Sequence, residues 1–214
     1  IFRQHDSRFI EVLNHLRDNR ATKEDIALLN CHYQSQAGPV SGADRPAVGE
    51  AEPIIITTHN RTAHSINARK MEALSAPSSF FEATITGEFP EKMFPLPSRI
   101  ELKVGAQLMF IRNDYGEQKA YVNGSLARVL QIGDDEVIVE LQENRTKYVL
   151  KQELWENKKY ILNEERNEVE EEVIGTFEQY PVKPAWAVTV HKSQGLTFDR
   201  AVIDVGQAFA PGQV

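Results

Sequence analysis

Hydrophobic residues near the start of the chain recur at helical spacing. They predict an amphipathic helix over residues 6–19, with Asp6 or Ser7 as its N-cap. The apolar face of that helix would consist of Phe9, Val12, Leu13 and Leu16. A second helix is predicted to begin at Thr22, where Asp25 three positions later completes a capping-box pattern.

The pattern then changes from helices to a buried strand followed by a helix. Residues 34–53 are polar and rich in Gly, Pro, Ser and Ala, which predicts a long loop. The β-branched run 54–56 (III) that follows is typical of a buried parallel strand, and it leads through THNR into a helix with Asn60 as its predicted N-cap. Strand, short turn and helix form half of a βαβ unit. Buried-strand character returns near the end of the chain, in AWAVTV and RAVIDV.

Between these α/β segments, the period of the pattern is two. Residues 75–100 contain four prolines and are expected to be irregular, whereas 102–180 contain about five short alternating runs with turns such as Asn123-Gly124. Such runs favour a small antiparallel barrel. The simplest interpretation is one α/β domain, residues 1–101 and 181–214, with a β-barrel inserted at 102–180.

Composition and charge add few constraints. The chain is 41% hydrophobic and 26% charged, as expected of a folded domain, and no apolar run is long enough to cross a membrane. Most of the net charge of −7 resides in residues 164–172, six Glu and one Arg, which we interpret as a solvated surface segment. The single cysteine, Cys31, predicts a protein of a reducing compartment, and no Cys/His spacing suggests a metal site. The chain begins at Ile1 and stops at Val214 without a natural-looking terminus, so we expect it to be a piece of a longer protein.

The stretch 185–199 (AWAVTVHKSQGLTFD) carries the most informative chemistry. Strand alternation would place Thr189 and His191 on one face. Four residues then follow where the strand ends, Lys192, Ser193, Gln194 and Gly195, and the carboxyl ends of strands in an open α/β sheet are where ligands bind. A cation, hydroxyls, an amide and a glycine that permits close backbone approach suit phosphate. The alternative is a polar turn with no ligand.

This stretch closely resembles motif V of superfamily 1B DNA helicases of the PIF and RecD type. Four other stretches resemble the same family in the same order. IFRQ resembles motif IV, THNRTAHSIN the segment after it, LKVGAQLMFIRND with YVNGSLARV the start of the inserted SH3-like barrel, and AFAPGQV the lead-in to motif VI. The resemblance implies an α/β fold: a RecA-like domain of the P-loop NTPase type, without the P-loop itself, that carries the barrel as an insert.

The resemblance also implies roles for individual residues. Arg3 would be catalytic, reaching the terminal phosphate of the nucleotide from the second RecA-like domain. The nucleotide would be bound by Arg3, Gln4, Gln194 and Gly195. DNA would be bound by Thr57, His59, Asn60, Arg61, Thr189, His191, Lys192 and Ser193. Asn60 has helix capping as an equal alternative, Arg112 and Asn113 fit a strand end better than a DNA contact, Trp186 is expected in the core, and Trp155 and Tyr160 are undecided.

These features predict a fragment of an ATP-dependent DNA helicase, of 5′→3′ direction and intracellular, cytoplasmic location. Its partners would be single-stranded DNA, ATP with Mg²⁺ in the full-length protein, and the first RecA-like domain of that protein, with no membrane partner. The chain contains no G-x-x-x-x-G-K-[ST] loop, so we expect no activity and no bound cofactor in the fragment alone. The rivals are a non-enzymatic nucleic-acid-binding or scaffold module, and a RecA-like ATPase motor that does not unwind.

Overall fold

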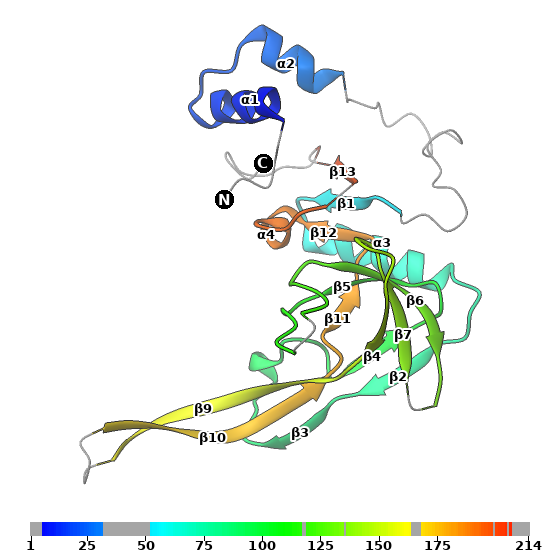
Figure 1. The fold of residues 1–214 in the computed structure, drawn as a ribbon, viewed down its shortest axis with the longest axis vertical. Helices are drawn as coiled ribbons and strands as arrows, with labels where there is room; N and C mark the ends of the chain where they lie inside the picture. The colour runs from blue at the N-terminus through cyan, green and yellow to red at the C-terminus, as the bar shows by residue number, and fades with distance from the viewer. Residues whose placement is uncertain are drawn as a thin grey trace. The chain divides into compact units, whose positions relative to one another are not determined.

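The computed structural model describes residues 6–31, 52–116, 119–134, 136–163, 168–198, 200–204 and 206. The chain divides into two units, residues 1–47 and 48–214. The first contains helices α1 (Ser7–Arg17) and α2 (Lys23–Asn30) (Figure 1). Asp6 caps α1 by accepting hydrogen bonds from two backbone N–H groups, and Thr22 and Asp25 form the predicted capping box of α2. Both helix starts are therefore confirmed, while most of the predicted loop lies outside the described residues.

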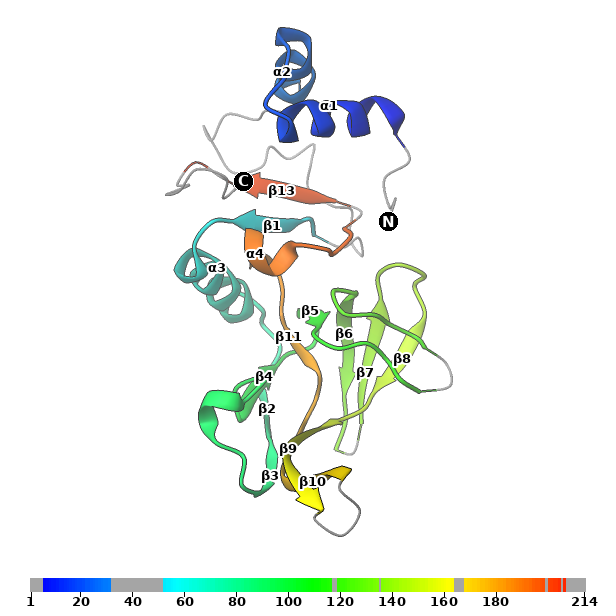
Figure 2. The same cartoon turned by 90° about the vertical axis from the view of Figure 1, so that its left-hand side faces the viewer.

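The second unit contains a three-stranded parallel sheet. Strand β1 (Ile54–Thr57) lies between β12 (Ala187–Thr189) and β13 (Ala201–Asp204) (Figure 1), and Figure 2 shows β1 and β13 side by side. Helix α3 (Asn60–Glu72) follows β1 and packs against β1 and β12, and the short helix α4 (Val190–Ser193) follows β12. The predicted parallel strands and the strand–turn–helix unit are thus confirmed.

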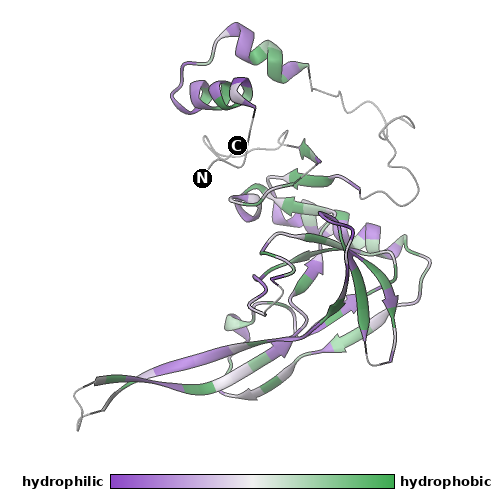
Figure 3. Ribbon diagram, in the orientation of Figure 1, coloured by the Kyte–Doolittle hydropathy of each residue, from purple (hydrophilic) through white to green (hydrophobic). Residues whose placement is uncertain are grey.

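Three local predictions in this sheet are wrong. His59 occupies the N-cap of α3 in extended conformation, and its side chain makes no capping hydrogen bond, so Asn60 is already helical. Strand β12 ends at Thr189 and the chain turns into α4, so the alternation does not continue to His191. The predicted buried character of RAVIDV is the third, because most of β13 is exposed, whereas all three residues of β12 are buried as predicted. Although most of β13 is exposed, Figure 3 shows that both β1 and β13 consist largely of hydrophobic residues.

The β-only part of the sequence forms antiparallel sheets. The largest has the order β11-β5-β6-β7-β8, so β11 and β8 are its ends among the described strands, and the pairings do not close a barrel. The bounds of its strands are β5 Gln107–Phe110, β6 Leu126–Ile132, β7 Val137–Leu141, β8 Lys147–Leu150 and β11 Val182–Pro184. The predicted antiparallel strands and the Asn123-Gly124 turn are present, and Gly124 has a φ of +95°.

The segment predicted to be irregular instead contains short strands. These elements are β2 (Ser79–Glu82), β3 (Thr84–Gly87), the 3₁₀ turn η1 (Glu91–Met93) and β4 (Arg99–Leu102). The four prolines of this segment all lie between the elements rather than inside them, so each strand keeps its ladder hydrogen bonds. Strands of four residues are too short to show a clear period in the sequence.

A long hairpin extends from the second unit (Figure 1). It consists of β9 (Glu153–Asn163) and β10 (Glu168–Gln179), and β3 pairs with the base of β10. The described glutamates of the acidic segment, Glu170 to Glu172, are exposed on β10, as a solvated segment would be. One of them, Glu171, forms an ion pair with Lys158 across the hairpin.

Two hydrophobic clusters hold the second unit together. The larger one contains most of the buried apolar residues of β5, β6 and β7 together with Met71 of α3 and Trp186. Trp186 is 4% exposed, which confirms its predicted core position. The smaller cluster contains Ile54 and Val188 of the parallel sheet and Met109 of β5. The second cluster therefore packs the parallel sheet directly against the antiparallel one.

The base of the long hairpin depends on a glycine. A Cβ atom added to Gly175 would lie 2.3 Å from the backbone oxygen of Glu88 and 2.4 Å from its carbonyl carbon. Backbone atoms cannot move aside as a flexible side chain can, so we expect Gly175→Ala to destabilise the chain by about 1–3 kcal/mol or more. Urea denaturation monitored by circular dichroism would measure the change. Gly133→Ala is the matched control, since its added Cβ would meet no atom closer than 3.5 Å. Equal stability of the two variants would contradict this packing.

Candidate functional site

A cleft of about 750 Å³ lies between α3 and β12 on one side and the antiparallel strands on the other. It opens beside the carboxyl ends of the parallel strands, where the sequence placed its candidate residues. Polar and aromatic side chains from both parts line it, among them Asn60, Asn123, Trp155, Lys183, Thr189 and Lys192. The cleft is large enough to hold a small ligand or a segment of an extended polymer.

The wall of the cleft on the parallel-sheet side is formed by strand ends in register. Thr57 is paired with Thr189 on one side and with Asp204 on the other, so the three strands end at one edge. Thr57, Thr58 and Thr189 are buried, and the Thr58 hydroxyl and His59 Nδ1 lie 2.8 Å apart. This edge is therefore polar but closely packed, and only part of it reaches the cleft.

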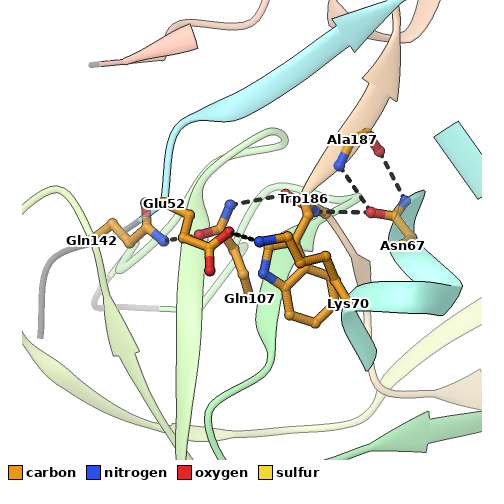
Figure 4. A network of polar contacts seen from close by, with 8 residues as sticks. Glu52, Asn67, Lys70, Gln107, Gln142, Trp186 and Ala187 are labelled. Carbon is orange, nitrogen blue, oxygen red and sulfur yellow. Dashed lines mark hydrogen bonds and ion pairs between the residues drawn. The ribbon is translucent and has the colours of Figure 1, made fainter. Parts of the chain in front are cut away.

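The Asn67 side chain fixes the start of β12 (Figure 4). Its Oδ1 accepts hydrogen bonds from the backbone N–H of Trp186 at 2.9 Å and of Ala187 at 2.8 Å. Its Nδ2 donates to the Ala187 carbonyl oxygen at 2.9 Å. One amide thus makes three hydrogen bonds to a strand about 120 positions away in sequence. Helix α3 and strand β12 are thereby held in a single arrangement.

Gln107 fixes the same segment from the antiparallel side (Figure 4). Its Nε2 donates to the Ala185 carbonyl oxygen at 3.0 Å, and the Ala185 N–H donates to the Gln107 carbonyl oxygen at the same distance. The Gln142 side chain in turn donates to Gln107 Oε1 at 3.2 Å. Residues 185–187, which lead into the candidate stretch, are therefore held by side chains from both parts of the unit.

The chain turns sharply after β12. The Ser193 hydroxyl donates to the Val190 carbonyl oxygen at 2.8 Å, and Gly195 has a φ of +78°, a conformation that other residues adopt at a cost. Leu196 then packs against the Asn123-Gly124 turn, since a Cβ added to Gly124 would lie 2.5 Å from a Leu196 methyl carbon. The candidate turn thus rests on the antiparallel part of the unit.

The structure brings together only some of the residues predicted from sequence. Asn60, Thr189 and Lys192 line the cleft. The other candidates of the second unit do not line it: Thr57 is buried, Ser193 and His59 are partly buried, and Arg61, His191, Gln194 and Gly195 are exposed. Arg3 and Gln4 lie outside the described residues.

Other residues of this site were not identified from the sequence. Asn67 interrupts an apolar stripe on α3, four positions after Ala63 and four before Met71, and a polar residue in such a stripe was the available signal. The sequence leaves Trp155 undecided and gives no signal for Lys183, because only the path of β9 and the pairing of β11 with β5 bring them to the cleft.

The cleft is positively charged although the chain is acidic. Lys183 and Lys192 face it with His64, and Glu101 is the only carboxylate among its lining residues. Burial lowers the pKa of Lys183, and the neighbouring charge of Lys192 lowers it further. Glu101 accepts a hydrogen bond from Ser78 and lies 4.0 Å from Lys103 Nζ, so part of its charge is already compensated. An anion in the cleft would relieve the repulsion between the two lysines.

Within the described residues, no group of three or more His, Cys, Asp or Glu side chains is arranged to hold a metal ion. None of the helices described is long and apolar enough to cross a membrane.

Comparison with known proteins gives a consistent result. The chain is 29% identical over 213 residues to the ATP-dependent DNA helicase Pif1 of Bdellovibrio bacteriovorus, covering 97% of this chain and 43% of that protein. It is 27% identical to human ATP-dependent DNA helicase PIF1, of which it covers 31%. No protein-family model matches it.

Solved structures show the same similarity. Bacteroides sp Pif1 in complex with ADP-AlF4 matches with a TM-score of 0.82 and 35% identity, over 100% of this chain and 46% of that one. Bacteroides Pif1 bound to ssDNA matches with a TM-score of 0.67 and 34% identity, over the same shares of the two chains. The chain therefore spans less than half the length of these relatives.

The Asn67 hydrogen bonds make a direct prediction about stability. Asn67→Ala removes three hydrogen bonds and leaves two N–H groups and a carbonyl near the core without this partner, so we expect a loss of about 2–4 kcal/mol. Thermal unfolding measures it, and hydrogen exchange of the Trp186 and Ala187 amides should accelerate. Arg69→Ala, an exposed position on the same helix, is the control. Unchanged exchange at those amides in Asn67→Ala would be incompatible with the hydrogen bonds described.

Proposed function

The chain belongs to the Pif1 family of DNA helicases as part of such a protein, and we propose that it supplies the second RecA-like domain and an inserted SH3-like barrel. Residues 1–101 and 181–214 would form the RecA-like domain and residues 102–180 the insert. The mixed fold supports this proposal, since a parallel sheet with βα connections is interrupted by antiparallel strands between α3 and β12.

The whole protein would couple ATP hydrolysis to movement along single-stranded DNA in the 5′→3′ direction. In this proposal it unwinds DNA inside the cell, in the cytoplasm. Hydrolysis needs groups that position the nucleotide and stabilise charge from both sides of a cleft between two domains. This chain would supply one side, and the first RecA-like domain of the same protein the other.

The nucleotide contacts of this side would come from four residues. Arg3 would stabilise the charge that develops on the terminal phosphate, and Gln4 would bind beside it. Gln194 and Gly195 are exposed on the turn after α4 and are not among the residues that line the cleft. Gly195 has no side chain to obstruct a phosphate, and its positive φ is a conformation that favours glycine.

The chain offers an incomplete set of ligands for Mg²⁺-ATP. It contains no P-loop sequence, and its described residues include no acidic cluster for a metal ion. When bound, the metal ion would neutralise charge on the phosphates. Its protein ligands would therefore belong to the first RecA-like domain, and this chain would orient the nucleotide without holding the metal.

Single-stranded DNA would bind in the cleft and along the adjoining edge. The observation that carries this proposal is the placement of Asn60, Thr189 and Lys192 on one cleft wall, at the carboxyl ends of β1 and β12. Thr57, His59, Arg61, His191 and Ser193 would contribute to the edge around it. Cationic and hydroxyl groups bind the phosphate backbone, so the binding would be independent of base sequence.

The turn after α4 would connect the nucleotide site to the DNA cleft. Lys192 lines the cleft, and Gln194 lies only two residues further along the chain on the exposed side. Because Ser193 and Leu196 fix this turn, movement of the nucleotide side would be transmitted to the DNA side. A scaffold module or a motor that does not unwind would retain the DNA cleft, and a strand-displacement assay on the full-length protein separates these alternatives.

We expect the 214-residue chain to bind single-stranded DNA weakly and in a salt-dependent manner. Lys192→Gln removes one phosphate contact, so it should weaken binding and reduce the slope of log K against log salt by about one unit. Fluorescence anisotropy of a labelled oligo-dT at several salt concentrations measures both. Lys147→Gln on β8, an exposed lysine that does not line the cleft, is the control. Equal effects of the two variants would refute the proposed cleft.

The chain alone should not hydrolyse ATP above background, because half of the catalytic groups are missing. A coupled assay of phosphate release, with and without oligo-dT, measures this. DNA-stimulated turnover by the purified chain would contradict the division of the site between two domains.

A further inference from the structure

Two of the residues that line the cleft, Trp155 and Lys183, have no role in the DNA contacts proposed above. Trp155 reaches the cleft from β9 and Lys183 reaches it from β11, so both come from the antiparallel strands opposite Thr189 and Lys192. Neither residue is required for packing in the way Trp186 is, since both are only partly buried. An aromatic ring and a cation beside a second cation form a set that recognises nucleotides.

The indole ring of Trp155 is held in a defined orientation. The Arg112 guanidinium carbon lies 5.3 Å from the Trp155 ring centroid, and the Trp155 and Phe177 rings form a T-shaped pair with centroids 5.9 Å apart and an interplanar angle of 70°. Arg112 is itself fixed, because Nη1 donates to the Leu154 carbonyl oxygen at 2.6 Å and pairs with Glu153 at 3.7 Å. Arg112 is thus a positioning residue for an aromatic ring that also lines the cleft.

Lys183 is placed to meet an anion. It forms none of the ion pairs found among the described residues, and the nearby charge of Lys192 repels its own. Antiparallel pairing sets Lys183 opposite Met109, whose side chain belongs to the cluster between the two sheets. Lys183 therefore stands on a strand that is already fixed, so phosphate binding has to order only its side chain and not its backbone.

We propose that Trp155, Lys183 and Lys192 form a subsite for one unpaired nucleotide of single-stranded DNA, in which the indole stacks on the base and the two ammonium groups bind adjacent phosphates. This subsite rests on the proposed function, because it extends the same DNA path from the parallel sheet onto the insert. Stacking on an indole requires a base that is not already stacked in a duplex, so the subsite favours single strands.

The test separates stacking from phosphate binding with two probes, oligo-dT and an oligomer of abasic phosphodiester sites. Trp155→Leu should weaken oligo-dT binding about 5-fold to 150-fold and leave binding of the abasic oligomer unchanged. Trp155→Phe keeps an aromatic ring and should restore most of the affinity for oligo-dT. Lys183→Gln should weaken binding of both probes and reduce the salt slope, with Lys147→Gln as the control.

A second measurement needs no substitution in the cleft. The chain has two tryptophans, and Trp186 is buried in the core, so quenching of intrinsic fluorescence by oligo-dT would report on Trp155. We expect quenching in the wild-type chain and its loss in Trp155→Phe. Two results together would overturn the subsite: no quenching of the wild-type chain by oligo-dT, and normal oligo-dT affinity of Trp155→Leu. If Lys192→Gln still weakened DNA binding, the proposed DNA cleft would stand without the subsite. Absence of all DNA binding by the wild-type chain would overturn both.

Discussion

The second unit depends on the three hydrogen bonds of Asn67. They join a helix that follows β1 to a strand that begins about 120 residues later, after the whole antiparallel segment. Without them, the start of β12 would be held to α3 only by non-directional apolar contacts, which fix position less well than hydrogen bonds. Because β12 ends at Thr189 and the chain continues to Lys192, the Asn67 amide, together with Gln107 on the other side, sets where these two cleft residues lie.

The cleft also shows why net charge is a poor guide to function here. The chain carries −7, yet two lysines face the cleft, and the exposed run Glu170 to Glu172 lies on β10 beyond the part of that strand that pairs with β3. Exposed charges farther apart than about 8–10 Å are largely screened at physiological salt, so these glutamates, which lie along the hairpin from its Trp155–Phe177 pair, contribute little to the potential at the cleft. The positions of charged side chains around the cleft, rather than the net charge of the chain, therefore decide which ligand this surface attracts.

Sequence patterns predicted the parts of the fold that depend on local interactions. The capping box at Thr22, the buried run at Ile54 and the switch from helical to alternating period each reflect contacts between near neighbours. The short strands after α3, the end of β12 at Thr189 and the contributions of Trp155 and Lys183 depend on pairings between distant segments. A single sequence contains no signal for those pairings, and so half of the cleft could not be predicted.

Photo-crosslinking of 4-thiothymidine oligonucleotides to the 214-residue chain, with mass spectrometry of the adducts, tests the DNA cleft most directly. Crosslinks form only at short range, so they locate the strand without any substitution. We predict adducts on peptides that contain Asn60, Trp155, Lys183 or the stretch from Thr189 to Lys192. Adducts confined to β7 and β8, with none on these cleft residues, would contradict the account.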